Sequence, residues 1–75
     1  MLDKNDKIAI WGTGLYAKKF YLMEYKNYDI VCFYDNDSKM WNKELYGIPV
    51  RKWDDNREIK VVIASSYWQE ILAQL

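Results

Sequence analysis

The residues that offer the clearest chemistry follow a short apolar run near the start of the chain. Residues 12–17 read GTGLYA, a G-x-G-x-x-A spacing typical of a strand-to-helix turn that holds the phosphates of a nucleotide. Gly12 would let the chain turn tightly out of the strand, and Gly14 would let a ligand approach the backbone. Amide groups at the start of the helix favour an anion there. The candidate ligand-binding residues of this turn are Gly12, Thr13, Gly14, Leu15 and Tyr16.

A second group of polar residues follows the next apolar run. Asp35 comes 21 residues after Gly14, close to the spacing of about 20 at which a carboxylate hydrogen-bonds a ribose hydroxyl. Its charge would repel a 2′-phosphate, so it favours NAD over NADP. The alternative is that Asp35 only caps the turn after its strand. Asn36 joins the candidate ligand set, whereas Asp37 and Ser38 are more typical of a helix cap.

The end of a third apolar run supplies the remaining candidates. Ala64 and Ser65 follow this run, and in an open α/β sheet they would lie beside the glycine turn. Ser65 is placed to reach a ligand, although serines at such positions often satisfy backbone groups instead. Ser66, with Gln69 three residues later, fits the capping box of a final helix.

No catalytic or metal-binding group accompanies these residues in the sequence. The chain has no histidine and one cysteine, Cys32, so it cannot build a Cys-His nucleophile pair or a Cys/His metal site by itself. None of its tyrosines has a lysine four positions later, the acid–base pair of many sugar-nucleotide dehydrogenases and epimerases. We therefore expect a binding module, without catalytic residues in this chain alone.

Alternating strand and helix patterns must position these groups. Short apolar runs predict buried strands, and a three-to-four-residue apolar period predicts helices. Pro49 restricts a brief strand after Gly47 to an edge or an end. The predicted strands are Lys7–Trp11, Asp29–Tyr34 and Glu58–Ala64, and the predicted helices are Leu15–Lys26, the short Lys39–Leu45 and a segment that starts at Ser66.

This order of elements predicts one α/β domain over residues 1–75. We expect a three-layer Rossmann-like fold, in which a small parallel sheet of about four strands has helices on both faces. The chain is 51% hydrophobic and 17% aromatic, enough for a packed core. Eleven basic residues balance eleven acidic ones, so no nucleic-acid partner is expected. The sequence shows no signal peptide or long apolar span, which predicts a cytoplasmic protein without a membrane partner.

Several segments together resemble a known family. The glycine turn, residues 31–37 (VCFYDND), residues 41–43 (WNK) and residues 47–50 (GIPV) resemble the Rossmann-like domain of bacterial surface-polysaccharide proteins. Relatives are UDP-amino-sugar acetyltransferases and capsule nucleotide-sugar dehydratases. The resemblance implies that Gly12, Gly14, Asp35 and Ser65 border a UDP-sugar or NAD. The resemblance also implies that the chain is a fragment of a larger sugar-modifying transferase or dehydratase, whose further domains would be its partners. Ala17 departs from the commoner glycine.

Two functions follow from these patterns. The leading one is a nucleotide-binding domain whose ligand is a UDP-sugar or NAD. The alternative is an interaction or scaffold domain that keeps the fold without a ligand and self-associates through an open sheet edge. In the alternative, Trp11 or Tyr16 would fill the space above the glycine turn.

Overall fold

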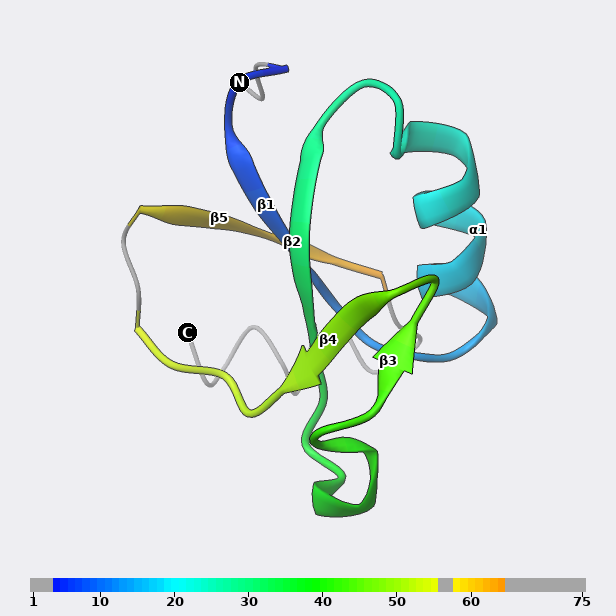
Figure 1. Ribbon diagram of the computed structural model, residues 1–75, viewed down its shortest axis with the longest axis vertical. Helices are drawn as coiled ribbons and strands as arrows, with labels where there is room; N and C mark the ends of the chain where they lie inside the picture. Colours follow the sequence, from blue (N-terminus) through cyan, green and yellow to red (C-terminus); the bar gives the residue numbers. More distant parts are fainter. Residues whose placement is uncertain (1–3, 56–57, 65–75) are drawn as a thin grey trace.

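The computed structural model describes residues 4–55 and 58–64 of the chain. Its centre is a five-stranded sheet with the order β3-β4-β2-β1-β5 (Figure 1). Among the described residues, a single α-helix, α1 (Leu15–Glu24), connects β1 to β2, and a 3₁₀ turn, η1 (Ser38–Met40), follows β2. The strands are β1 (Lys7–Trp11), β2 (Asp29–Tyr34), β3 (Glu44–Leu45), β4 (Ile48–Arg51) and β5 (Ile59–Ile63).

The sheet mixes parallel and antiparallel pairing. β1 lies between β2 and β5 and is parallel to both, and β2 is also parallel to β4. The short β3 runs antiparallel to β4. Because Trp11 pairs with both Tyr34 and Ile63, β1, β2 and β5 end at the same edge of the sheet.

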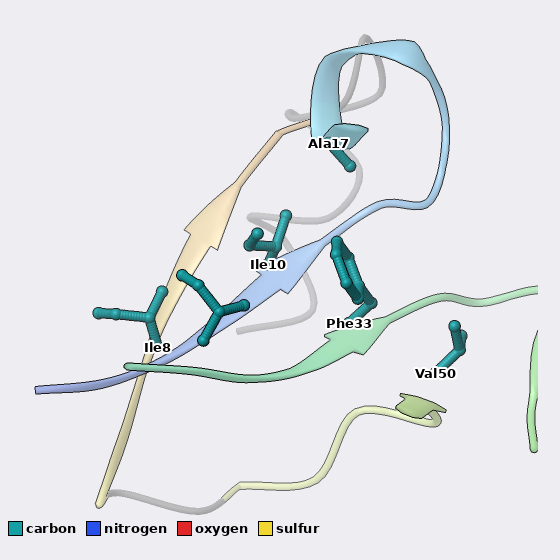
Figure 2. Close-up of a cluster of buried hydrophobic side chains, with 6 residues drawn as sticks. Ile8, Ile10, Ala17, Phe33 and Val50 are labelled. Atoms are coloured by element: carbon teal, nitrogen blue, oxygen red, sulfur yellow. The ribbon is translucent and has the colours of Figure 1, made fainter. Parts of the chain in front are cut away.

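Alternation along the central strands builds one apolar cluster on each face. Ile8 and Ile10 of β1 face α1 and pack with side chains of β2 and β4. Ala17 of α1 points toward this cluster (Figure 2) and is fully buried. A methyl group at this position allows the helix to lie close to the sheet. The buried residues of this cluster are Ile8, Ile10, Ala17, Ile30, Phe33 and Val50.

The opposite face of the sheet carries the second cluster. Trp11 is buried there, with its ring stacked on Trp53 at a centroid distance of 5.7 Å and meeting Tyr34 edge-on at 5.8 Å. Cys32 and Ala9 complete the buried set. Trp53 comes from the connection between β4 and β5, so a loop side chain packs on this face.

The prediction of a three-layer Rossmann-like fold is wrong. The sheet has five strands instead of about four, and β3 makes it mixed instead of parallel. Among residues 4–55 and 58–64 there is one α-helix, α1, and not a layer of helices on each face. The helix predicted from Ser66 lies outside the described residues. No helix within the described ranges is long and apolar enough to cross a bilayer.

The helix predicted over Lys39–Leu45 is also wrong. Its beginning forms η1, in which the Asp37 carboxylate accepts a hydrogen bond from the Lys39 amide at 3.0 Å, the predicted capping role. Asn42 then has φ 67°, a left-handed conformation that ends any helix. The chain continues as β3 and returns as β4.

A tight turn joins β3 to β4. Leu45 pairs with Ile48, so Tyr46 and Gly47 form a two-residue loop, and both have positive φ, 54° and 77°. This is the signature of a type I′ hairpin turn. Pro49 follows on β4 at a point where pairing with β2 has not yet begun, since that pairing starts at Val50. Its missing N–H therefore costs no hydrogen bond to β2.

The other elements agree closely with the sequence analysis. The predicted bounds of β1 and β2 match the structure, and β5 begins one residue later and ends one residue earlier than predicted. Helix α1 begins at the predicted Leu15 and ends at Glu24 instead of Lys26. These elements carry the glycine turn and Asp35.

Candidate functional site

The residues that follow β1, β2 and β5 lie side by side at one edge of the sheet. The Gly12 amide donates to the carbonyl of Tyr34 at 2.8 Å, and the Ala64 amide donates to the carbonyl of Trp11 at 3.0 Å. These bonds extend the strand pairing by one residue on each side of β1. Gly12, Asp35 and Ala64 are therefore brought together, as the sequence predicted, whereas Ser65 lies outside the described residues.

Gly12 turns the chain from β1 toward α1. Its φ of 125° is a conformation that residues with a Cβ atom adopt only at a cost. Because its N–H is already donated to Tyr34, the role of Gly12 in the turn is conformational. The prediction that Gly12 permits a tight turn is confirmed.

Gly14 has a different environment. It is the N-cap of α1, with φ −87° and ψ −160°, an extended conformation open to any residue. A Cβ atom at Gly14 would meet no heavy atom within 4 Å among the described residues outside its chain neighbours. Neither backbone geometry nor packing in the described structure therefore requires glycine at this position.

The beginning of α1 presents amide groups beside Gly14. The first hydrogen bond of the helix runs from the Lys18 amide to the Gly14 carbonyl at 3.1 Å, so the amides of residues 15–17 precede the helical ladder. Within the part of the chain that the structure describes, no side chain caps this end, and the first turn has no acidic residue. Leu15 and Tyr16 are exposed. The positive end of the helix dipole is thus accessible at this edge.

Asp35 is hydrogen-bonded to the glycine turn. The Thr13 hydroxyl donates to Oδ2 of Asp35, which joins the loop after β1 to the end of β2. Oδ1 of Asp35 accepts from the Asp37 amide at 2.8 Å, an Asx turn of the kind expected from the capping alternative. A carboxylate has about four acceptor positions, so the contacts made by the described residues leave two for a ligand hydroxyl.

Two side chains near Asp35 were not singled out as ligand-binding candidates by the sequence analysis. Trp41 donates its indole N–H to the Asp35 carbonyl at 2.7 Å, and the Lys52 ammonium lies over the Trp41 ring at 5.8 Å. Lys52 follows β4, whose Arg51 pairs with Tyr34 at the same edge. The sequence alone does not show that Lys52 lies near the end of β2, because the two come together only through the pairing of β4 with β2. Asn36, by contrast, is exposed and lies in the turn after Asp35.

Two titratable side chains, Cys32 and Tyr34, are buried on the sheet face opposite α1. Burial raises the pKa of the Cys32 thiol and that of the Tyr34 phenol above their ordinary values. Both side chains are almost fully buried, so they belong to the core. Among the described residues no group of three or more acidic, cysteine or histidine side chains could hold a metal ion.

Comparison with known families identifies the domain type. The model of the family described as C2185-like, N-terminal, matches residues 4–75, which include every element described above. The chain belongs to this family. No curated protein matches the C2185-like chain, and no solved structure matches it. Its function must therefore be inferred from the geometry of the C2185-like domain itself.

Proposed function

We propose that this C2185-like domain binds a nucleotide, a UDP-sugar or NAD, at the turn between β1 and α1. The phosphates would lie over Gly14 against the amides that begin α1. The sugar nearest to Asp35 would use the two remaining acceptor positions of that carboxylate. The domain would supply binding, and any catalysis would belong to other regions of a larger sugar-modifying protein.

The observation that carries this proposal is the open space at Gly14. Backbone conformation explains glycine at two positions, because φ is 125° at Gly12 and 77° at Gly47. Gly14 has neither positive φ nor a close neighbour in the described structure. Apart from the general preference for glycine over larger apolar residues at an N-cap, the described structure gives no internal cause for Gly14, and close approach of a ligand to the backbone supplies one.

The neighbouring groups suit the charges of such a ligand. The uncapped start of α1 favours a phosphate, and α1 has no carboxylate in its first turn to oppose it. Asp35 lies beside this anion site and would repel a second phosphate on the ribose. This arrangement supports a UDP-sugar or NAD and disfavours NADP. The resemblance to polysaccharide proteins makes UDP-amino sugars the first ligands to test.

The alternative of a ligand-free interaction domain has weaker support at this turn. It requires Trp11 or Tyr16 to fill the space above the glycines. Trp11 packs on Trp53, on the sheet face opposite α1, and Tyr16 is 62% exposed. Neither side chain comes within 4 Å of the Cβ position at Gly14.

Calorimetric titration with UDP-N-acetylglucosamine and with NAD tests the proposal. We expect one of them to bind, and Gly14→Val to weaken its binding at least about tenfold by occupying the approach to the backbone. Leu22→Val is the matched control, since Leu22 is exposed on the same helix two turns away, and it should bind like the wild type. Equal binding by the Gly14 variant and the control would reject the site.

A further inference from the structure

The large exposed apolar side chains of the described residues gather on one side of the domain. Four belong to α1, one follows α1, and one lies in the β3–β4 turn, and each is between 45% and 75% exposed. The turn lies beside α1 (Figure 1), because Tyr46 stacks on Tyr21 with a centroid distance of 4.5 Å. We call this set the α1 surface: Leu15, Tyr16, Leu22, Met23, Tyr25 and Tyr46.

The α1 surface lies opposite the helix side that packs on the sheet. Ala17 is the fully buried residue of α1, and Leu15 and Leu22 are seven residues apart, which places them on one line of the helix away from Ala17. Large apolar residues on the outer side of a helix have no role in the sheet packing. Concentrated exposed apolar area of this kind marks an interaction surface.

Lysines repeat along the α1 surface with the same seven-residue spacing. Lys19 comes four residues after Leu15, and Lys26, in the turn that follows the helix, comes four residues after Leu22. Lys18 adds a third exposed positive charge. The carboxylate of α1, Glu24, is half-buried and accepts a hydrogen bond from the Asn27 side chain at 3.0 Å. The outer side of α1 therefore presents apolar groups bordered by positive charge.

The aromatic portion of the α1 surface is held in place by ring stacking. Tyr21 lies between Tyr25 and Tyr46, stacked on each at 5.4 and 4.5 Å, and it also contacts the core ring of Phe33. Tyr and Met are enriched in the cores of protein interfaces. A rigid aromatic contact loses little entropy on binding, so this composition favours a protein partner over a lipid surface.

We propose that the α1 surface docks a helix of a partner protein or domain whose apolar stripe is bordered by carboxylates. In one class of helix–helix contact, apolar residues repeat every seven positions and flanking charges select the partner. One half of such a contact is present in Leu15 and Leu22, with Lys19 and Lys26 beside them. A second copy of the chain would bring lysine against lysine. An acidic amphipathic helix satisfies both the apolar and the charged groups of the surface.

A pair of synthetic helical peptides tests this proposal with the intact chain. Both carry the same leucine stripe, one bordered by glutamates and the other by lysines, and binding is followed by the backbone amide signals of α1 in NMR. The glutamate peptide should bind at least about tenfold more tightly than the lysine peptide. The triple variant Lys18→Glu, Lys19→Glu, Lys26→Glu should reverse this preference. Leu22→Ser with Met23→Ser should weaken both peptides without changing the melting temperature.

Several results would overturn the proposal. Equal binding of the two peptides, or none, would reject the charge selection. A concentration-dependent dimer in sedimentation that Leu22→Ser removes would make a second copy the occupant. Binding to phosphatidylglycerol vesicles that the triple charge variant abolishes would assign the surface to a membrane. Since Leu22 and Met23 lie away from Gly14, the results of Leu22→Ser and Met23→Ser do not depend on nucleotide binding.

Discussion

At the scale of single residues, the two glycines of the β1–α1 turn have separable roles. Gly12 bends the backbone with φ 125°, and Gly14 leaves space beside the start of α1. The sequence motif predicted the tight turn at Gly12, because the G-x-G-x-x-A spacing follows a recognisable strand. Its reason for Gly14, the approach of a ligand to the backbone, stays a prediction. It also placed Asp35 correctly at the end of β2. It could not show that Thr13 donates to Asp35, since two residues 22 positions apart meet only through the parallel pairing of their strands.

Substitution of each glycine by alanine should separate the two roles in stability. Gly12→Ala should lower the free energy of unfolding by about 1–3 kcal/mol, because alanine resists the positive φ. Gly14→Ala should change it by less than about 1 kcal/mol, since its extended backbone conformation is open to alanine and the new methyl group meets open space, so that only the lower N-cap preference of alanine remains. Urea unfolding of both variants measures the difference. Equal losses would mean that Gly14 is structural and that its open space has another cause.

At the scale of elements, the sequence predicted the long elements and failed on the short ones. β1, β2 and α1 have enough residues for apolar periodicity to identify them. β3 has two residues, too few for any period, so the pattern of residues 39–45 predicts a helix where the chain forms the end of η1 and β3. The left-handed conformation of Asn42 suits its residue type. That of Tyr46, in the turn of the hairpin, is not predicted for a tyrosine.

Substitutions of Tyr46 should separate the free-energy cost of its backbone conformation from the stabilisation that its ring stacking provides. Its positive φ costs about 1–2 kcal/mol, and stacking on Tyr21 returns about 0.5–1.5 kcal/mol. Tyr46→Ala keeps the backbone cost and loses the stacking, so we expect a loss of about 1 kcal/mol in the free energy of unfolding. Tyr46→Asn loses the same stacking but suits a type I′ turn, and it should be the more stable of the two. The reverse order in thermal melts would contradict the turn geometry.

At the scale of the whole molecule, one sheet separates two apolar clusters with different chemistry. The cluster beneath α1 is built from aliphatic groups and Phe33, whereas the opposite one contains Cys32 and Tyr34, both titratable and buried. The sequence predicted buried strands over the segments that contain Trp11 and Cys32, and both side chains are buried. The mixed sheet could not be predicted, because the strand that makes it mixed, the antiparallel β3, is too short to be recognised in the sequence.

Burial of Cys32 and Tyr34 should make the domain less stable in alkali. Their pKa values are raised in the folded state, so unfolded chains lose these protons first, from about pH 9 upward. The stabilising effect is complete below that pH and is lost as the pH rises. We expect the free energy of unfolding to fall from about pH 9 upward, by up to about 1.4 kcal/mol per pH unit for each group.

Cys32→Ala isolates the lower range of this pH dependence. The alanine variant lacks the thiol, so its stability should decline with a shallower slope than that of the wild type between about pH 9 and 10. Urea unfolding at a series of pH values measures both slopes. Identical slopes in the two proteins would show that Cys32 does not resist ionisation in the folded state.

The most direct test of nucleotide binding at the β1–α1 turn is an NMR titration of the ¹⁵N-labelled chain with UDP-N-acetylglucosamine and with NAD. If phosphates settle over Gly14, the amide signals of residues 14–17 and of Asp35 should move most and saturate with one dissociation constant. The signals of Lys60 and Asp6, an ion pair remote from the turn, should stay fixed. Unmoved signals at residues 14–17 with millimolar concentrations of both ligands would contradict the proposed function.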